Sequence, residues 1–231
     1  YLAASDIATV QPASGQISTR VTILGSNLLG HGSSIVSVTL AGVEVSQIVS
    51  FNDTVVEVVA ASGPAGGASG NVVLTADTGA TTVEVSGWQY LQVSQIDSVS
   101  PAAGIDGTRV TIFGQRLLGG GSSIDSVVLA GIAVESIVGG GNNTAVEVVA
   151  GRNFASAVGD VVVTSNTGAV TVLANGWSYR APGLINTVSP AFGQLGTLVT
   201  ISGSGLRMGS AAVATVQLVG RTATIVSEND T

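Results

Sequence analysis

The chain has 231 residues and a net charge of −7, with seven arginines, no lysine and no cysteine. A negative chain without basic patches does not fit nucleic acid or an anionic membrane surface as a partner, and the lack of cysteine excludes disulfides and thiol chemistry. No stretch approaches the roughly 18 uninterrupted apolar residues of a membrane span, so we expect no membrane insertion of this segment.

Short runs of alternating apolar and polar residues follow one another from the N-terminus, separated by Gly, Pro, Asn and Asp. This period of two is typical of β-strands with one buried face, and no segment shows the period of an amphipathic helix. About seven short strands at regular spacing predict an antiparallel β-sandwich. The predicted strands are 7–10, 20–24, 36–40, 43–49, 55–59, 71–76 and 82–90.

The same pattern returns at a fixed spacing of 89 residues, as Pro12, Pro101 and Pro190 show. Trp88 and Trp177 follow the same interval. Fixed-period self-similarity indicates a tandem array of one module. The predicted strands of the second copy are 96–99, 109–113, 126–129, 132–138, 145–149, 160–164 and 170–179.

Both ends of the chain are predicted to cut across a copy of the module. Tyr1 and Leu2 precede Tyr90 and Leu91 by the same interval, so they resemble the tail of a preceding repeat. The predicted boundaries are residues 1–4 for that tail, 5–93 for repeat 1, 94–182 for repeat 2, and 183–231 for the N-terminal part of a truncated repeat 3.

The apolar positions of the predicted strands give the expected core of repeat 1. We expect Trp88 to fill the core and not to serve as a ligand platform, because its neighbours are alternating apolar residues. The predicted core residues are Val21, Ile23, Val38, Leu40, Val58, Val73 and Trp88.

Each repeat also carries the pattern I-x-x-V-x-P-x-x-G-x-x-x-T-x-V-T-I-x-G or its close variant, followed by a loop and V-x-L-x-G. In repeat 1 the pattern runs from Ile7 to Gly25, and the second part from Val38 to Gly42. These motifs resemble the IPT/TIG domain, an immunoglobulin-like β-sandwich. The resemblance implies an all-β chain of tandem immunoglobulin-like sandwiches in a linear array. It does not identify a function, since the family occurs in receptors, adhesins, accessory modules of polysaccharide enzymes and transcription factors.

One motif with its own chemistry recurs at the same place in every repeat. Asn52, Asn142 and Asn229 each begin an N-x-T triplet without proline, the acceptor pattern for N-glycosylation. Asn-Asp and Asn-Asn are also good turn residues, and a polar turn at this place is frequent in IPT/TIG domains. We predict N-linked glycans at these three asparagines, with a purely structural turn as the alternative. Because only 9% of the residues are charged, the sugars would hydrate the surface.

Groups for catalysis or metal binding are few. His31 is the only histidine and aligns with Gly120, so it is not part of the shared module. We predict no catalytic residues, no enzyme activity, no metal and no cofactor, and leave a structural calcium ion between repeats as an alternative. The candidate acids are scattered and form no calcium loop: Asp6, Asp77, Asp97, Asp125 and Asp160.

Only five residues separate Tyr90 from Ile96, and five separate Tyr179 from Ile185. Such short linkers restrict bending, and equal periods predict equal rotations along a regular helix. We therefore predict a structural segment of an extracellular or cell-surface fibre or stalk, whose partners are neighbouring repeats, identical chains and glycans. The alternatives are an adhesin or receptor ectodomain that binds carbohydrate or protein through its loops, and an accessory domain of a polysaccharide-active enzyme.

Overall fold

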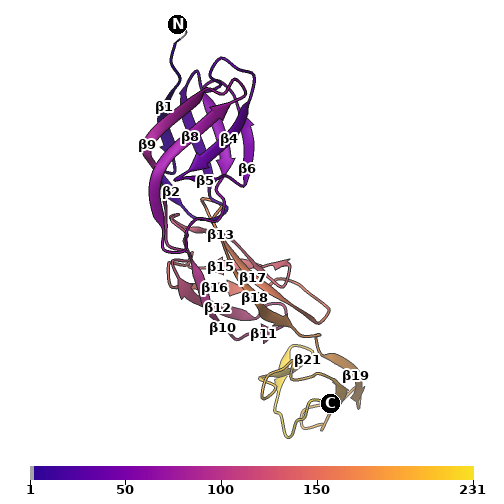
Figure 1. Cartoon of the computed structure of the whole chain (residues 1–231). Helices are drawn as coiled ribbons and strands as arrows, with labels where there is room; N and C mark the ends of the chain where they lie inside the picture. Colours follow the sequence, from indigo (N-terminus) through magenta and orange to yellow (C-terminus); the bar gives the residue numbers. More distant parts are fainter. Residues whose placement is uncertain (1–2) are drawn as a thin grey trace.

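The computed structural model describes residues 3–231, and its regular elements are all β-strands (Figure 1). This confirms the predicted all-β fold. Tyr1 and Leu2, the two residues compared with Tyr90 and Leu91, lie outside the described residues. Figure 1 shows the units in a row, from the indigo end through magenta and orange to yellow. Within residues 3–231 no helix is long and apolar enough to cross a membrane.

Repeat 1 is a sandwich of two sheets. Its strands are β1 (Asp6–Gln11), β2 (Ser14–Gly15), β3 (Arg20–Ser26), β4 (Ile35–Leu40), β5 (Val43–Glu44), β6 (Gln47–Phe51), β7 (Val55–Val59), β8 (Ala68–Ala76) and β9 (Thr81–Tyr90). The four-stranded sheet has the order β1-β3-β7-β6, and the five-stranded sheet has the order β2-β9-β8-β4-β5. Neighbouring strands are antiparallel except β2 and β9, which pair in parallel.

Repeat 2 has the same topology, with one sheet β10-β12-β16-β15 and the other β11-β18-β17-β13-β14. Its strands are β10 (Gln95–Ser100), β11 (Ala103–Gly104), β12 (Arg109–Gln115), β13 (Ile124–Leu129), β14 (Ile132–Ala133), β15 (Ser136–Val138), β16 (Ala145–Val149), β17 (Ala157–Ser165) and β18 (Val170–Tyr179). The immunoglobulin-like sandwich expected from the sequence is thus present in both repeats.

The strand predicted at 43–49 is wrong in one respect, because it is two strands in two different sheets. β5 pairs with β4 in the five-stranded sheet, whereas β6 pairs with β7 in the four-stranded sheet. The chain crosses between the sheets at consecutive residues: Val45 N donates to Val38 O, and Ser46 N donates to Val59 O. The predicted strand 132–138 divides in the same way into β14 and β15. The two halves pair in different sheets, and the sequence pattern shows no clear break where the chain crosses between them.

The predicted core is confirmed at six of its seven positions, which are all at most 1% exposed: Val21, Ile23, Val38, Leu40, Val58 and Trp88. Val73 is wrong, because it is half-buried while its neighbours Val72 and Leu74 are buried. Three consecutive apolar residues do not reveal which of them points inward. The pairing of β8 with β9 also contains an irregularity between Gly70 and Val72.

The large aromatic residues of the last strand lie at the centre of each core. Trp88 packs edge-on against Tyr90 with ring centroids 5.6 Å apart, and Trp177 packs against Tyr179 in the same way at 5.5 Å. Burial raises the pKa of the Tyr90 hydroxyl. Trp88 is 1% exposed, which agrees with its predicted role as core filler.

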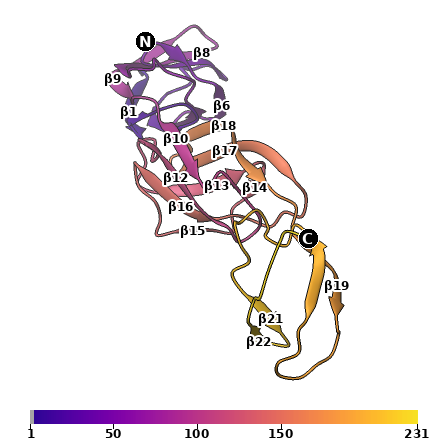
Figure 2. The ribbon, with the colours of Figure 1, turned by 90° about the horizontal axis from the view of Figure 1, so that it is seen from below.

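Residues 183–231 form two small sheets, β19-β20 and β21-β22, and contain no fully buried residue. The strands are β19 (Leu184–Ser189), β20 (Thr200–Ser204), β21 (Val216–Leu218) and β22 (Arg221–Ala223). Ile185 is 58% exposed, whereas its counterparts Ile7 and Ile96 are 4% exposed. Figure 2 shows β21 and β22 beside β19, without the further strands that close the sandwiches of repeats 1 and 2.

Candidate functional site

In repeats 1 and 2 the predicted glycosylation triplets form the turn between the last two strands, in chain order, of the four-stranded sheet. Asn52 lies between β6 and β7 and is exposed. Its Oδ1 accepts hydrogen bonds from Thr54 N at 2.8 Å, Thr54 Oγ1 at 2.9 Å and Val55 N at 2.9 Å. Asn142 makes the same three contacts in repeat 2 at the same distances. The turn geometry considered as the alternative is therefore present in both repeats.

The middle residue of the triplet forms two hydrogen bonds with the loop after β3 in repeat 1, and with the loop after β12 in repeat 2. The backbone oxygen of Asp53 accepts from Leu28 N at 3.1 Å, and Asp53 Oδ1 accepts from Leu29 N at 3.2 Å. Asn143 makes the same two contacts in repeat 2. Leu28 is 1% exposed, so these bonds fix a loop that contributes the Leu28 side chain to the core. Sequence reasoning did not identify this second role.

The structural role of the triplet leaves the glycan-bearing atom available. Oδ1 of Asn52 takes part in the turn, whereas its Nδ2 makes no hydrogen bond within residues 3–231. The same holds for Asn142. A glycan on Nδ2 is compatible with the three turn contacts, and N-glycosylation stays a prediction.

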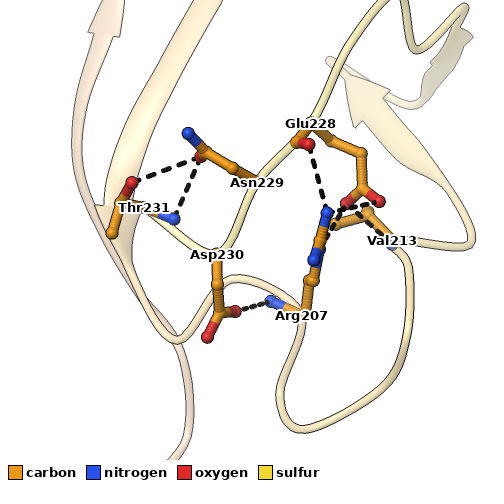
Figure 3. A network of polar contacts seen from close by, with 6 residues as sticks. All are labelled: Arg207, Val213, Glu228, Asn229, Asp230 and Thr231. Carbon is orange, nitrogen blue, oxygen red and sulfur yellow. Dashed lines mark hydrogen bonds and ion pairs between the residues drawn. The ribbon is translucent and has the colours of Figure 1, made fainter.

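The third triplet keeps the turn in a looser form (Figure 3). Asn229 Oδ1 accepts from Thr231 N at 3.1 Å and from Thr231 Oγ1 at 3.3 Å. Asp230 Oδ1 accepts from Arg207 N at 2.8 Å, which corresponds to the contact of Asp53 in repeat 1. Asn229 is exposed like the other two asparagines.

Repeat 3 adds an ion pair beside this turn (Figure 3). Arg207 stands where repeats 1 and 2 have Leu29 and Leu118, and its Nη2 lies 3.2 Å from Glu228 Oε1. Val213 N donates to Glu228 Oε2 at 3.0 Å. The hydrogen bond from Val213, followed by that from Arg207, holds the pKa of the Glu228 carboxyl below its usual range. The ion pair joins the segment around Glu228 to the loop that contains Arg207.

The histidine and the candidate acids do not come together. His31 is exposed, and its Nε2 lies 2.9 Å from Ala3 O. Asp77 accepts from Ser33 N at 3.1 Å and from the Ser33 and Ser34 hydroxyls, and these bonds lower the pKa of its carboxyl. Among residues 3–231 no group of three or more His, Cys, Asp or Glu side chains could hold a metal ion. The absence of a catalytic or calcium site stays a prediction.

A cleft of about 470 Å³ lies between repeats 1 and 2 and was not predicted. Arg20 of β3 in repeat 1 and Asp125 of β13 in repeat 2 both line it, and neither side chain has a hydrogen bond or ion pair within the described part of the chain. By contrast, Arg109 at the position equivalent to Arg20 pairs with Glu147 at 2.8 Å. The remaining lining residues are Ser18, Gln47, Val59, Thr164, Ser165, Asn166 and Gly168.

The only sequence signal for this cleft is the replacement of Val36 in repeat 1 by Asp125 in repeat 2. That signal becomes meaningful only when β3 of one repeat is known to face β13 of the next. The cleft is polar, is formed by two repeats, and has no aromatic residue in its lining. Chemically, it presents one cation, one anion and several hydroxyl and amide groups.

Comparison with protein families identifies repeat 1. Residues 5–88 match the model of the IPT/TIG domain, which confirms the resemblance seen in the sequence. The match covers the region from before β1 to near the end of β9. No curated protein matches the chain.

Several solved structures are similar to the chain at low identity. A Bacteroides ovatus mixed-linkage glucan utilization locus SGBP-B, in complex with a mixed-linkage heptasaccharide, is 14% identical with a TM-score of 0.32, over 81% of this chain and 48% of that one. The surface glycan-binding protein PbSGBP-B from Prevotella bryantii is 14% identical with a TM-score of 0.31, over 77% and 42%. A gamma-CGTase from alkalophilic Bacillus clarkii is 15% identical with a TM-score of 0.34, over 78% and 26%. The chain thus spans half or less of each of these structures, and the low TM-scores carry no functional conclusion.

Proposed function

We propose that this chain, whose first repeat is an IPT/TIG domain, is a structural segment of an extracellular or cell-surface fibre or stalk. The observation that carries this proposal is the direct packing of one sandwich on the end of the next. Arg20 N of repeat 1 donates to Thr167 O of repeat 2 at 2.9 Å, and the linker residue Ser94 is 7% exposed. Such contacts restrict bending and allow tandem modules to transmit load along the row.

The proposal includes one N-linked glycan per repeat, at Asn52, Asn142 and Asn229. All three asparagines are exposed. Large apolar side chains are also open to solvent on the strands, among them Val36 at 57% and Val85 at 72% exposure. A surface with few charges and exposed apolar side chains needs another source of hydration or a covering neighbour, and glycans supply the first.

Electron microscopy of native material tests the structural role. We expect a thin filament or stalk with an axial step on the order of 35–45 Å, the length of a strand-based module of this size. The neighbouring repeats or identical chains are its main partners. A monodisperse globular particle would contradict the proposal.

Mass spectrometry tests the glycans independently of shape. The intact mass of native material should fall when N-glycans are removed enzymatically. Asn52→Asp keeps the oxygen that accepts from Thr54 and Val55 but removes the acceptor nitrogen, so it should lose one glycan without losing the turn. Asp53→Asn is the matched control, because it keeps the triplet and reproduces the Asn-Asn-Thr sequence of repeat 2. An unshifted mass for the native protein would exclude glycosylation.

A second candidate function is recognition of a carbohydrate or protein, as in an adhesin or receptor ectodomain. The observation in its favour is the cleft between repeats 1 and 2, where Arg20 and Asp125 have no partner within residues 3–231. Binding of soluble oligosaccharides, measured by calorimetry on the chain and on Arg20→Ala, tests it. The Arg109→Ala variant is the control, since Arg109 occupies the equivalent position but pairs with Glu147. Equal binding by both variants would exclude the cleft.

A further inference from the structure

The junction between repeats 1 and 2 contains a buried bridge of side-chain hydrogen bonds. Gln16 follows β2, and Ser94 precedes β10. Gln16 Oε1 accepts from Ser94 N at 2.8 Å, and Gln16 Nε2 donates to Ser94 Oγ. Ser94 Oγ donates in turn to Arg116 O. Gln16 is only 2% exposed, so breaking this Gln16–Ser94–Arg116 bridge would leave buried polar groups without partners.

A separate segment of repeat 2 makes a second contact with repeat 1. Arg20 N donates to Thr167 O in the turn between β17 and β18. A Cβ on Gly168 would lie 3.0 Å from Ser18 O, so the turn packs closely on the backbone of repeat 1. Because the linker and this turn hold repeat 1 at two places, a tilt of repeat 1 would strain at least one of them.

The junction between repeats 2 and 3 lacks the bridge. At the positions equivalent to Gln16, Ser94 and Arg116, 89 residues later, the chain has Ile105, Gly183 and Gly205. Ile105 and Gly183 offer no polar side-chain atom in place of the Gln16 amide and the Ser94 hydroxyl, whereas Arg116 contributes only its backbone oxygen, which Gly205 also has.

Within residues 3–231, one side-chain hydrogen bond crosses that second junction, and it is exposed. It runs from Arg180 Nη1 to Gly209 O at 3.3 Å. An exposed bond made by a long side chain constrains orientation weakly, because water competes for both groups. A Cβ on Gly183 would lie 2.5 Å from Gly205 O, so this position has no room for a serine side chain in the conformation described.

We propose that the row has one stiff junction and one hinge. The Gln16–Ser94–Arg116 bridge locks repeats 1 and 2 into one rigid pair, and the linker 180–183 lets repeat 3 swing against this pair. This inference rests on the proposed structural role and deepens it, since it replaces the equal rotations expected from the period by two different kinds of joint. Stiffness is thereby set repeat by repeat through two side-chain positions, those of Gln16 and Ser94.

Distance measurements between spin labels test the hinge, and the absence of cysteine from the chain makes labelling simple. Thr9, Ser98 and Thr187 are equivalent positions, and all three are exposed. The double variants Thr9→Cys/Ser98→Cys and Ser98→Cys/Thr187→Cys span the first and the second junction. We expect a narrow distance distribution across the first junction and a broad one across the second. The pair Thr187→Cys/Thr222→Cys, both exposed positions within residues 183–231, should stay narrow, so that breadth across the second junction does not come from opening of that segment. Equal widths would overturn the proposal.

The variant Gln16→Ile tests the bridge, because it gives the first junction the residue of the second. It leaves the contact between Arg20 and Thr167 intact, so the width change reports the side-chain bridge alone. The distribution for labels 9 and 98 should broaden towards that for labels 98 and 187, with an unchanged circular dichroism spectrum. Gln92→Ala is the control, since Gln92 is an exposed linker residue without a side-chain hydrogen bond in the described chain. An unchanged width in Gln16→Ile would refute the lock, while electron microscopy of native material judges the stalk separately.

Discussion

At the scale of single residues, the side chains do more than one task at a time. Asn52 stabilises its own turn through Oδ1 and keeps Nδ2 available, while Asp53 beside it anchors a loop of the core. The repeated triplet is therefore explained by folding alone, and a glycan would be an addition to that role. Val73 shows what a local sequence pattern does not decide, since the direction of its side chain depends on the pairing of β8 with β9.

Neighbouring alanine substitutions in β8 test this direction. Val72→Ala removes buried methyl groups and should lower the free energy of unfolding by about 2–3 kcal/mol. Val73→Ala changes a half-buried side chain and should cost about 1 kcal/mol or less. Urea denaturation of both variants measures the difference. Equal losses of unfolding free energy would contradict the observed difference in burial between Val72 and Val73.

At the scale of elements, a polar clamp joins the loop before β4 to the turn after β8. In repeat 1 the clamp is the Asp77 carboxylate, which accepts hydrogen bonds from Ser33. In repeat 2 the clamp is Asn166, which accepts from Ser122 N at 3.0 Å and donates to the Ser122 hydroxyl at 3.0 Å. The two clamps have the same geometry, but only one of them can titrate.

The clamp gives a prediction about pH. The hydrogen bonds from Ser33 lower the pKa of Asp77 in the folded chain. A depressed folded pKa stabilises the chain above the unfolded pKa, and this contribution is lost as the pH falls through the folded value. Asp77→Asn should therefore reduce the acid-induced loss of stability, and Asn166→Asp should increase it. Thermal unfolding across the acidic range measures both, and identical acid profiles for all three proteins would refute the assignment.

At the scale of the whole molecule, repeats 1 and 2 are closed sandwiches, whereas residues 183–231 have no buried core. Ile23 and Ile112 are fully buried, but their counterpart Ile201 in β20 is only partly buried. Within the 231 residues, the strands of 183–231 should therefore open most easily, because local opening is easiest where few apolar contacts must be broken.

Hydrogen exchange of the 231-residue chain checks this gradient. Backbone amides of β3 and β12 should exchange slowly, and those of β20 should exchange much faster under the same conditions. The equal position of these strands in their repeats makes the comparison direct. Equal protection of β20 and β3 would show that residues 183–231 are held by contacts other than those described.

The sequence by itself determined the strand pattern, the period of 89 residues, most of the core and the position of the three triplets. These features repeat locally, in alternation or in fixed motifs, so they can be read without knowing which strands meet. Only the tertiary structure decided how 43–49 divides between two sheets, which way Val73 points, and how Arg20 and Asp125 come to line one cleft. It also decided that Gln16 meets Ser94, 78 residues further along the chain. Such contacts depend on sheet pairing and on the packing of one sandwich against the next, and neither leaves a periodic trace in the sequence.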